Sequence, residues 1–364
     1  MTSTKIPVLN KGETARRLAE ELPRLIPNLK WEAINMGAKL RGEGRSYREL
    51  DIIAKVRSGS LSKTIVFEVK SIGEPRMAEQ TITQLRLETR ALPNAYLAFG
   101  APYISERSRE ICKSEGIGYV DLVGNAYLQF GPVLIDCVSG DCKVIDRREL
   151  KSIFSPKATR VVRALLQAPS ERARITKLAK DCSMSPAGVY FVVQSLDLKG
   201  FVTRGDDRTI ILSEPRRLLL EWAKNWSVEK SQVVRYFSFE KGPERLISQI
   251  SQAAKRLNVD YAFTGMAGAS MVAPFTRYDD VWFYAKGDTQ KLVKELDLRP
   301  VSSGANVVVL DPYDEGVFYG VRNLRGAQVV SNIQLFVDLY TYPARGQEQA
   351  EELLKKMPDF REAK

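Results

Sequence analysis

The sequence has 364 residues, more than the roughly 250–300 at which a single hydrophobic core stops growing, so two or three domains are expected. Apolar residues make up 44% and charged residues 27%, and no apolar run reaches the roughly 20 residues of a membrane span, which predicts a globular protein without a membrane partner. The net charge is +11 and histidine is absent, which excludes Ser–His and Cys–His catalysis, histidine-ligated zinc and histidine-dependent nucleases.

Residues 1–150 are predicted to form a mixed sheet with flanking helices, an α/β domain. Apolar residues at 15, 18, 19 and 22 indicate a first helix. A polar stretch between two apolar runs is typical of the turn of a β-hairpin. The predicted elements are helices at 12–23, 77–92 and 104–115, strands at 31–35, 95–99, 119–123 and 126–130, and a hairpin whose first strand is 51–56, whose turn is 57–63 and whose second strand ends with 67–70.

Two carboxylates and a lysine lie on the two strands of this hairpin. Asp51 opens the first strand, and Glu68 and Lys70 are two residues apart on the second, so their side chains point from one face. Asp51 and Glu68 could hold Mg²⁺ or Mn²⁺ through oxygen atoms, and Lys70 could orient water or offset charge on a phosphate. A metal-dependent phosphodiesterase needs this arrangement. The alternative is that the charges lie at strand ends and on a solvated face without a catalytic role.

Residues 151–228 are predicted to form a winged helix. Ser185 is the expected N-cap of its third helix, Pro186 the first helical residue, and Gly200 the C-cap. The order of helix, helix, turn, helix and wing is typical of DNA-binding modules. The predicted elements are helices at 156–167 and 175–181, a turn at 183–185, a third helix ending at 198, strands at 201–204 and 209–212, and a wing at 205–208.

Most of the excess positive charge lies in this middle segment. The net charge is +4 for residues 1–150, +7 for residues 151–228 and zero for residues 229–364. Such a local excess favours a polyanion, double-stranded DNA, as the partner. A protein-interaction module that uses the same fold without DNA is the alternative. The residues expected to contact phosphates are Lys157, Arg160, Arg163, Arg172, Arg174, Lys177, Lys180, Arg204 and Arg208.

The third helix of this segment is expected to face the bases. It offers polar side chains but no arginine for guanine, so base-specific contacts would be few. The exposed residues predicted on this face are Ser185, Tyr190, Gln194 and Ser195.

Residues 229–364 mix helices with strands. The predicted elements are helices at 244–257 and 346–357 and strands near 261–263, 281–284 and 306–310. The last helix is amphipathic. Apolar stripes of this kind more often pack on their own domain than on a partner, and we expect the same here.

Three stretches resemble the AbiEi-type antitoxins and transcriptional regulators of bacterial defence systems. They are residues 116–127, with Gly-Ile-Gly-Tyr-Val-Asp-Leu-Val-Gly-Asn-Ala-Tyr, residues 215–223, with Pro-Arg-Arg-Leu-Leu-Leu-Glu-Trp-Ala, and residues 333–350. The resemblance covers most of the chain. It implies sequence-specific DNA binding and repression, often of a toxin-encoding operon, and a cognate toxin as a possible partner.

Residues 1–135 also resemble the PD-(D/E)xK restriction-endonuclease fold. The family pattern maps onto Asp51, Glu68, Lys70 and a helix glutamine, Gln80 or Gln84, of which we assign Gln80 to the predicted catalytic site. The family often has a helix glutamate as well, for which Glu20 or Glu21 is the candidate. Leu50 stands where the family usually has proline, which makes the match less specific.

The C-terminal segment resembles a nucleotidyltransferase fold. The glycine turn of that family would be Thr264-Gly265-Met266, and its two metal-binding acids would be at positions 280 and 282. Position 282 is tryptophan, which cannot bind a metal. The resemblance therefore implies a non-catalytic relative.

The sequence as a whole predicts a three-domain DNA-binding protein: an endonuclease-like domain at 1–150, a winged helix at 151–228 and a degenerate nucleotidyltransferase-like domain at 229–364. We favour a transcriptional regulator or antitoxin. A Mg²⁺- or Mn²⁺-dependent DNA endonuclease and an antitoxin that binds only protein are the alternatives. A homodimer is plausible, because paired half-sites need a two-fold protein.

The location and the thiols are predicted from simpler features. The chain begins with a polar, charged segment rather than the apolar core of a signal peptide, which predicts a cytoplasmic protein. Cys112, Cys137, Cys142 and Cys182 have no C-x-x-C spacing, which argues against a zinc knuckle or redox pair and favours buried thiols.

Overall fold

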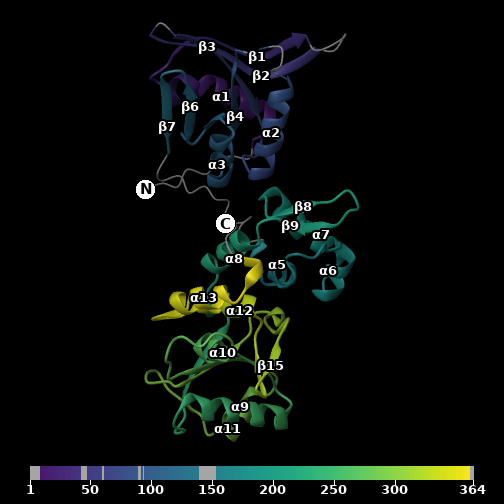
Figure 1. Cartoon of the computed structure of the whole chain (residues 1–364), viewed down its shortest axis with the longest axis vertical. Coiled ribbons are helices and arrows are strands. Elements are labelled where there is room, and N and C mark those ends of the chain that lie inside the picture. The colour runs from purple at the N-terminus through teal and green to yellow at the C-terminus, as the bar shows by residue number, and fades with distance from the viewer. Residues whose placement is uncertain are drawn as a thin grey trace. The chain divides into compact units, whose positions relative to one another are not determined.

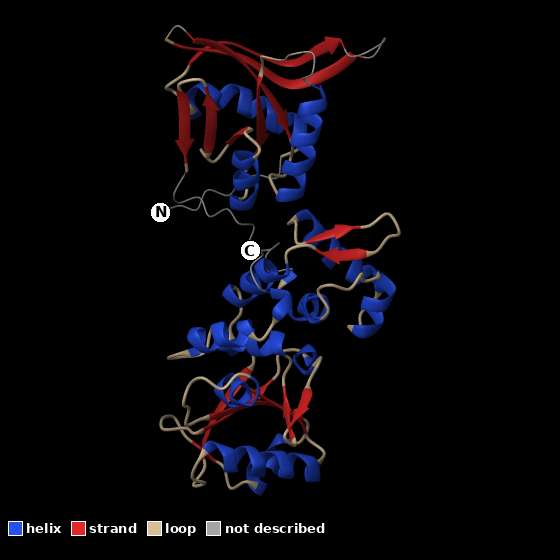
Figure 2. Cartoon of the chain, in the orientation of Figure 1, coloured by secondary structure: helices blue, strands red, loops and turns tan. Residues whose placement is uncertain are grey.

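The computed structural model describes residues 9–41, 47–59, 61–88, 92, 94–138 and 153–360. It divides into two compact units, one mainly within residues 1–147 and the other mainly within residues 148–364 (Figure 1). Each unit has a seven-stranded mixed sheet with helices, and the second also has a two-stranded sheet (Figure 2). The expected mixture of α and β structure is therefore confirmed. Within the described ranges, no helix has the length and apolar character needed to cross a membrane.

The first unit has a helix or strand at each predicted position and one strand that was not predicted, β7. The hairpin turn predicted at 57–63 is wrong in length, because β2 continues to Ser58 and β3 begins at Leu61. Its elements are α1 (Lys11–Leu25), β1 (Lys30–Arg41), β2 (Tyr47–Ser58), β3 (Leu61–Val69), α2 (Pro75–Glu88), β4 (Tyr96–Ala101), α3 (Glu106–Ser114), β5 (Gly118–Asp121), β6 (Ala126–Phe130) and β7 (Val133–Cys137). The strands lie in the sheet in chain order. β1, β2 and β3 are antiparallel, β3, β4 and β5 are parallel, and β6 and β7 form a hairpin at the edge.

Helices cover both faces of this sheet. Successive residues of a strand point to opposite faces, so a continuous apolar strand presents apolar side chains on both. Ile65 and Phe67 of β3 pack with Leu18 of α1 on one face. Val66, between them, packs with Leu85 of α2 on the other face. The burial of alternate β3 residues on two sides explains the continuous apolar run that ends this strand.

The second unit begins with the residues that we call the helix-turn-helix segment, residues 153–213. Its elements are α5 (Pro156–Gln167), α6 (Ile175–Asp181), α7 (Pro186–Leu198), β8 (Val202–Arg204) and β9 (Ile210–Leu212). α5 and α6 begin and end where the sequence predicted. The Ser185 hydroxyl accepts the backbone N–H of Gly188 at 3.1 Å, which confirms the predicted N-cap. Gly200 has a φ of +71°, as a residue that ends a helix requires.

A second sheet and its helices complete this unit. The strand order is β13-β10-β14-β12-β11-β16-β15. α9 and α11 pack on one face of the sheet, and α10, α12 and α13 pack on the other. The elements are α8 (Pro215–Lys224), η2 (Val228–Lys230), β10 (Gln232–Phe237), α9 (Pro243–Leu257), β11 (Asp260–Thr264), α10 (Gly265–Val272), β12 (Val281–Lys286), α11 (Thr289–Glu295), β13 (Arg299–Pro300), β14 (Val307–Asp311), η3 (Glu315–Phe318), β15 (Arg322–Leu324), β16 (Ala327–Val329), α12 (Asn332–Tyr340), α13 (Gly346–Lys355) and η4 (Pro358–Phe360).

The helix-turn-helix segment and the C-terminal sheet share one hydrophobic core. Val162 of α5, Trp222 of α8, Tyr284 of β12 and Phe336 of α12 all belong to it. The segments on either side of the predicted boundary at 228–229 therefore pack together. The predicted boundary at 150–151 lies outside the described residues.

The thiols differ in burial. Cys112 and Cys182 are buried as predicted, whereas Cys137, at the end of the edge strand β7, is exposed. Cys142 lies outside the described residues.

Candidate functional site

Acidic side chains meet on the hairpin of β2 and β3, as the sequence predicted. The pairing of Ile52 with Phe67 places Asp51 opposite Glu68. Asp51 does not open its strand, because β2 begins at Tyr47 and pairs along its length with β1. The Asp51 Oδ2 atom accepts the backbone N–H of the residue after Glu68 at 2.7 Å. Glu68 is only 1% exposed, so its charge depends on the partners around it.

Lys70 connects this hairpin to α2. Its Nζ atom donates to Glu68 Oε1 at 2.8 Å and to Gln84 Oε1 at 2.9 Å. Gln80 is exposed, one helical turn before Gln84. The assignment of Gln80 to the site is therefore wrong, and Gln84 is the glutamine that contacts Lys70.

The first residue of α1, Lys11, completes the cluster and was not predicted. Its Nζ atom lies 2.9 Å from Asp51 Oδ2 and 3.0 Å from Glu68 Oε1. A cation at the N-terminus of a helix is opposed by the helix dipole, so the two carboxylates must offset that cost. The sequence carried no signal for this contact beyond the position of Lys11 in the first helical turn.

The two predicted helix glutamates do not join this cluster. Glu20 pairs with Arg16 at 3.0 Å, and Glu21 pairs with Arg24 at 2.6 Å, both along the surface of α1. α1 therefore contributes a cation rather than an anion to the site.

The two carboxylates of the cluster respond differently to their surroundings. Burial raises the pKa of Asp51, and the N–H of Val69 and the Lys11 ammonium oppose it only in part. Burial acts in the same direction on Glu68, but hydrogen bonds from Lys70 and Lys11 outweigh it and lower the pKa of this carboxyl. Two ammonium groups thus face two carboxylates.

The cluster of Asp51, Glu68, Lys70 and Lys11 offers few ligands for a divalent metal. Mg²⁺ and Mn²⁺ need several oxygen ligands, and the cluster offers two carboxylates. Among the described residues, no group of three or more acidic, cysteine or histidine side chains is placed to hold a metal. The Lys11 ammonium contacts both Asp51 and Glu68, where a bridging cation would have to lie. In this arrangement the cluster does not fit a metal, and a metal could enter only if Lys11 moved away.

The exposed face of α7 carries two aromatic side chains. Tyr190 is 40% and Phe191 65% exposed, and Ser185 and Gln194 are exposed on the same helix. The hydroxyl of Ser195 donates to the Phe191 carbonyl at 3.0 Å and so faces its own helix. The predicted exposure is confirmed for Ser185, Tyr190 and Gln194, and the exposed Phe191 was missed.

Cationic side chains surround the helix-turn-helix segment. The backbone of Ala173 pairs with that of Ile210, which places Arg172 and Arg174 beside the hairpin of β8 and β9. Arg208, in the turn of this hairpin, is exposed. The exposed cations of this segment are Lys157, Arg172, Arg174, Lys177, Lys180, Arg204 and Arg208.

Two of these cations also have protein partners. Arg204 lies 5.2 Å above the ring of Tyr190 and 3.4 Å from Asp197, and Lys177 lies 3.1 Å from Glu171. The pairs are partly or fully solvent-exposed, so phosphate groups can compete with these carboxylates.

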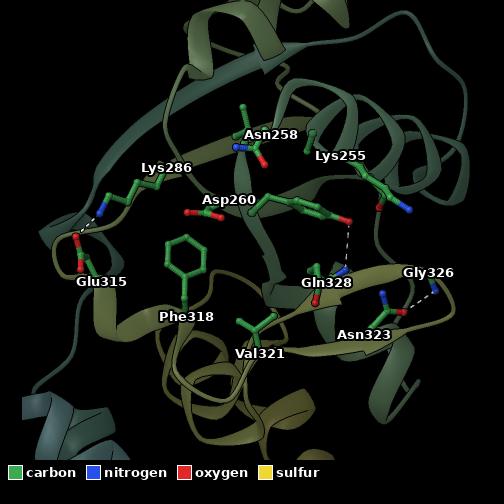
Figure 3. Close-up of a pocket in the computed structure, with 14 residues that line it drawn as sticks. Lys255, Asn258, Asp260, Lys286, Glu315, Phe318, Val321, Asn323, Gly326 and Gln328 are labelled. Atoms are coloured by element: carbon green, nitrogen blue, oxygen red, sulfur yellow. Dashed lines mark hydrogen bonds and ion pairs between the residues drawn. The ribbon is translucent and has the colours of Figure 1, made fainter. Parts of the chain in front are cut away.

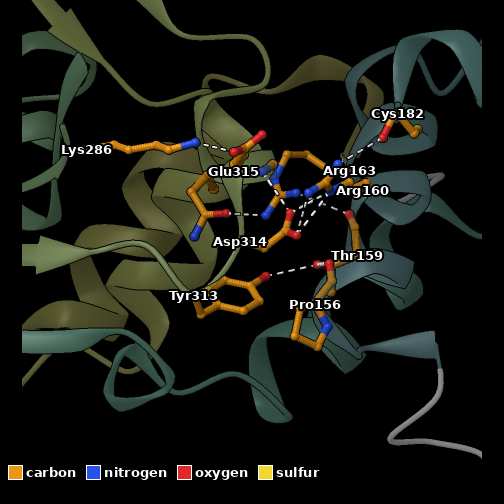
Figure 4. A network of polar contacts seen from close by, with 11 residues as sticks. Pro156, Thr159, Arg160, Arg163, Cys182, Lys286, Tyr313, Asp314 and Glu315 are labelled. Carbon is orange, nitrogen blue, oxygen red and sulfur yellow. Dashed lines mark hydrogen bonds and ion pairs between the residues drawn. The ribbon is translucent and has the colours of Figure 1, made fainter. Parts of the chain in front are cut away.

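Arg160 and Arg163, both predicted to contact phosphates, are engaged inside the unit (Figure 4). Arg160 forms a two-pronged ion pair with Asp314, Nε to Oδ1 at 2.8 Å and Nη2 to Oδ2 at 2.8 Å. Arg163 is fully buried, donates to Gln334 Oε1 at 2.7 Å and lies 5.0 Å above the ring of Trp222. Both arginines join α5 to the C-terminal part of the unit, and we remove them from the phosphate contacts.

A buried carboxylate continues this polar network. Asp338 accepts hydrogen bonds from Thr264 Oγ1 at 2.6 Å, Gln334 Nε2 at 2.8 Å and Tyr284 Oη at 3.1 Å. Burial raises the pKa of Asp338 to about 6, although these hydrogen bonds oppose the shift.

Asp280, the remaining acid of the nucleotidyltransferase-like pattern, is held by two aromatic side chains. Its Oδ2 atom accepts the indole N–H of Trp282 at 2.6 Å, and its Oδ1 atom accepts the hydroxyl of Tyr342 at 2.6 Å. Gly265 has a φ of +57°, and a Cβ atom there would lie 2.9 Å from the ring of Tyr342. Trp282, at the position where the resemblance would place a second acid, thus donates a hydrogen bond to one carboxylate oxygen of Asp280.

A cavity of about 810 Å³ lies between the end of α9, β11 and the β15–β16 hairpin (Figure 3). Charged, amide and apolar side chains line it, among them Asn258, Gln328 and Phe318. Lys286 and Glu315 on its wall form an ion pair with each other. These two charges are therefore already compensated within the cavity wall.

Residues 211–357 match the AbiEi antitoxin family. The family is described as "Transcriptional regulator, AbiEi antitoxin, Type IV TA system". The match begins in β9 and ends after α13, and it contains two of the three stretches that carried the resemblance, 215–223 and 333–350. The AbiEi resemblance is thus confirmed for the C-terminal part of the chain. No match was found among curated proteins.

Two solved structures share remote similarity with the chain. An antigenic nucleotidyltransferase-like protein from Paracoccidioides brasiliensis is 16% identical over 34% of this chain and 78% of its own, with a TM-score of 0.23. A protein of unknown function, AF1548, is 12% identical over 51% of this chain and 98% of its own, with a TM-score of 0.23. Similarity at this level carries no argument about fold or function.

Proposed function

We propose that this protein is a transcriptional regulator and antitoxin of a type IV toxin–antitoxin system, and that it binds double-stranded DNA through the helix-turn-helix segment, acting as a winged helix. The observation that carries the proposal is the AbiEi family match at 211–357, in a unit whose core continues into that segment. The net charge of +7 over residues 151–228 supports DNA as the partner.

In this proposal, contacts to the DNA phosphates and contacts to the bases come from different elements. Arg172, Arg174 and Arg208 surround the wing and suit phosphates, which position a protein on the duplex without reading its sequence. α7 would then enter the major groove with its exposed face toward the bases. Arg160 and Arg163 instead fix the segment to the rest of the unit.

The salt dependence of DNA binding tests this assignment. We expect Arg172→Ala with Arg174→Ala to weaken binding and to reduce the slope of log K against log salt by about 1.8, or about 0.9 for each phosphate that the variant no longer neutralises. Arg204→Ala with Arg208→Ala should act in the same direction. Fluorescence anisotropy of a labelled duplex, titrated at low and at moderate salt, measures both the affinity and the slope.

A matched control removes two arginines from α9, far from the segment in sequence. Arg245 and Arg256 are 77% and 59% exposed, and their replacement by alanine should leave the slope unchanged. Equal slopes for the wild type and the Arg172/Arg174 variant would contradict the proposed DNA surface. An equal reduction in the control would show that total charge, rather than this surface, drives binding.

A cognate toxin and a second copy of the chain are the further partners that we propose. The family description names a toxin–antitoxin system, and a two-fold repressor would match paired half-sites on DNA. Sedimentation with and without duplex DNA tests the dimer.

A metal-dependent endonuclease, which would require Lys11 to move away from Asp51 and Glu68, is the second candidate function. One observation favours it: Asp51, Glu68, Lys70 and Gln84 come together around one hairpin. Incubation of supercoiled DNA with Mg²⁺, Mn²⁺ or EDTA tests it directly. Nicking that requires metal and is lost in Lys70→Ala would establish a nuclease, whereas retardation of the DNA without cleavage favours the regulator.

A further inference from the structure

The exposed face of α7 carries no charged side chain, although exposed lysine and arginine side chains lie elsewhere in the helix-turn-helix segment. Ala187, Tyr190, Phe191 and Gln194 are exposed at the spacing i, i+3, i+4 and i+7, which places them on one side of the helix. Val193, on the other side, is fully buried. The exposed face therefore combines a methyl group, two aromatic rings and one amide, with no formal charge.

This composition suits the major-groove edges of A·T base pairs better than those of G·C base pairs. In the major groove, guanine is read mainly by arginine or lysine and cytosine by an acidic acceptor, and the face has neither. Adenine is read by a glutamine or asparagine amide through its N6 and N7 atoms, and thymine presents an apolar methyl group. Gln194 suits adenine, and Phe191, at 65% exposure, suits the thymine methyl.

One arginine, Arg204, contacts this face at the ring of Tyr190. Arg204 lies 5.2 Å above the ring of Tyr190 and 3.4 Å from Asp197, so its guanidinium is held at the edge of the face. The stacking also fixes the Tyr190 ring beside Phe191, whose ring centroid is 6.1 Å away. A preformed pair of rings contacts a methyl group with little loss of side-chain freedom.

Charge complementarity favours DNA over a protein as the occupant of this face. Arg172 and Arg174 lie beside the wing, and Lys180, on the helix before α7, is exposed. An apolar face bordered by cations matches a groove whose floor carries methyl groups and whose walls carry phosphates.

We propose that α7 selects A·T base pairs in the major groove, with Gln194 reading adenine and Phe191 contacting thymine methyl groups. This inference rests on the proposed DNA binding and adds the sequence class of the target. Tyr190 positions the Phe191 ring.

Competition between chemically altered duplexes tests the inference. We expect the wild-type chain to bind a mixed A·T duplex about tenfold or more tightly than a G·C duplex of equal length. Replacing thymine by uracil, which removes only the methyl group, should weaken binding by about fourfold for each methyl group that Phe191 touches. An inosine·cytosine duplex has an A·T-like minor groove and a G·C-like major groove, so it should bind like G·C.

Two variants identify the residues. 7-Deazaadenine lacks the N7 acceptor that Gln194 would contact, so its use in place of adenine should weaken binding of the wild type. Gln194→Ala should abolish this loss, and Phe191→Ser should abolish the difference between thymine and uracil. Both variants should keep wild-type affinity for the G·C duplex. Thr176→Ala, at an exposed position of α6, is the matched control. Unchanged circular dichroism and melting temperature verify that each variant is folded.

The outcomes separate this inference from the proposed function. Equal binding of A·T and G·C duplexes, or inosine·cytosine behaving like A·T, overturns major-groove selection by α7 but leaves DNA binding intact. Failure to bind any duplex overturns both. If Phe191→Ser leaves every DNA affinity unchanged, the face does not contact bases and is a candidate for protein contact instead.

Discussion

The ion pair between Arg160 and Asp314 provides a direct measure of how firmly the helix-turn-helix segment is joined to the C-terminal part of the unit. The side chains are 18% and 6% exposed, so solvent screens them little. Hydrogen bonds between charged groups contribute roughly 1.5–3 kcal/mol, and paired contacts lie at the upper end. We expect a coupling free energy of about 2 kcal/mol in a double-mutant cycle of Arg160→Met and Asp314→Ala.

Urea unfolding followed by tryptophan fluorescence measures this coupling. In a Trp31→Phe background the three remaining tryptophans, Trp222, Trp226 and Trp282, all lie in the second unit, so the signal reports that unit alone. The double-mutant cycle cancels the separate loss of the hydrogen bond from the Gly316 N–H to Asp314, because both Asp314 variants lack it.

The control is an ion pair of similar chemistry on the surface. Arg345 and Glu348 lie three residues apart and are both more than half exposed, so their coupling should be too small to measure. A coupling free energy below about 0.5 kcal/mol for Arg160 and Asp314 would refute the reasoning from burial. Two separate fluorescence transitions would refute the shared core.

Three further predictions concern charge and burial. The pKa of Asp338 in the folded protein, about 6, lies above its ordinary value of 3.8, so its favourable contribution to stability is fully present below pH 4 and is lost as the pH rises through 6. The free energy of unfolding of the wild type relative to Asp338→Asn should thus fall by about 3 kcal/mol between about pH 4 and pH 7, measured with urea, and a constant difference would contradict the raised pKa. Lys11→Met should increase Mn²⁺ affinity, measured by calorimetry, because Asp51 and Glu68 then face one ammonium instead of two; no binding would show that the hairpin is not a latent metal site. Arg163→Met should lower the free energy of unfolding by about 1–3 kcal/mol, because it leaves buried polar groups such as Gln334 Oε1 without a donor, whereas a stability within about 0.5 kcal/mol of the wild type would show that the apolar side chain repacks.

The local elements, and in part which of them are adjacent, follow from short-range features of the sequence. α5 and α6 could be delimited because proline, cap residues and apolar spacing act within a few residues of one another. The hairpin that brings Asp51 and Glu68 to neighbouring strands was predicted from the two apolar runs and the polar stretch between them. Its register was not, because Ser58 pairs with Leu61 and the turn is much shorter than the predicted 57–63. β7 escaped prediction because an edge strand with Leu134 65% exposed lacks the alternation that marks a half-buried strand.

The partner that each charged side chain contacts depends instead on how separate elements pack. Gln80 and Gln84 lie on the same side of α2, and the packing of that helix on the sheet decides that Gln84 reaches Lys70. Arg163 was predicted to contact phosphates as part of a basic segment, but α12 brings Gln334 to it and α8 brings Trp222. Lys11 meets the hairpin acids from a distant part of the sequence, a separation over which no periodicity carries information. Secondary structure arises from short-range rules, whereas the composition of a polar site depends on how separate elements pack.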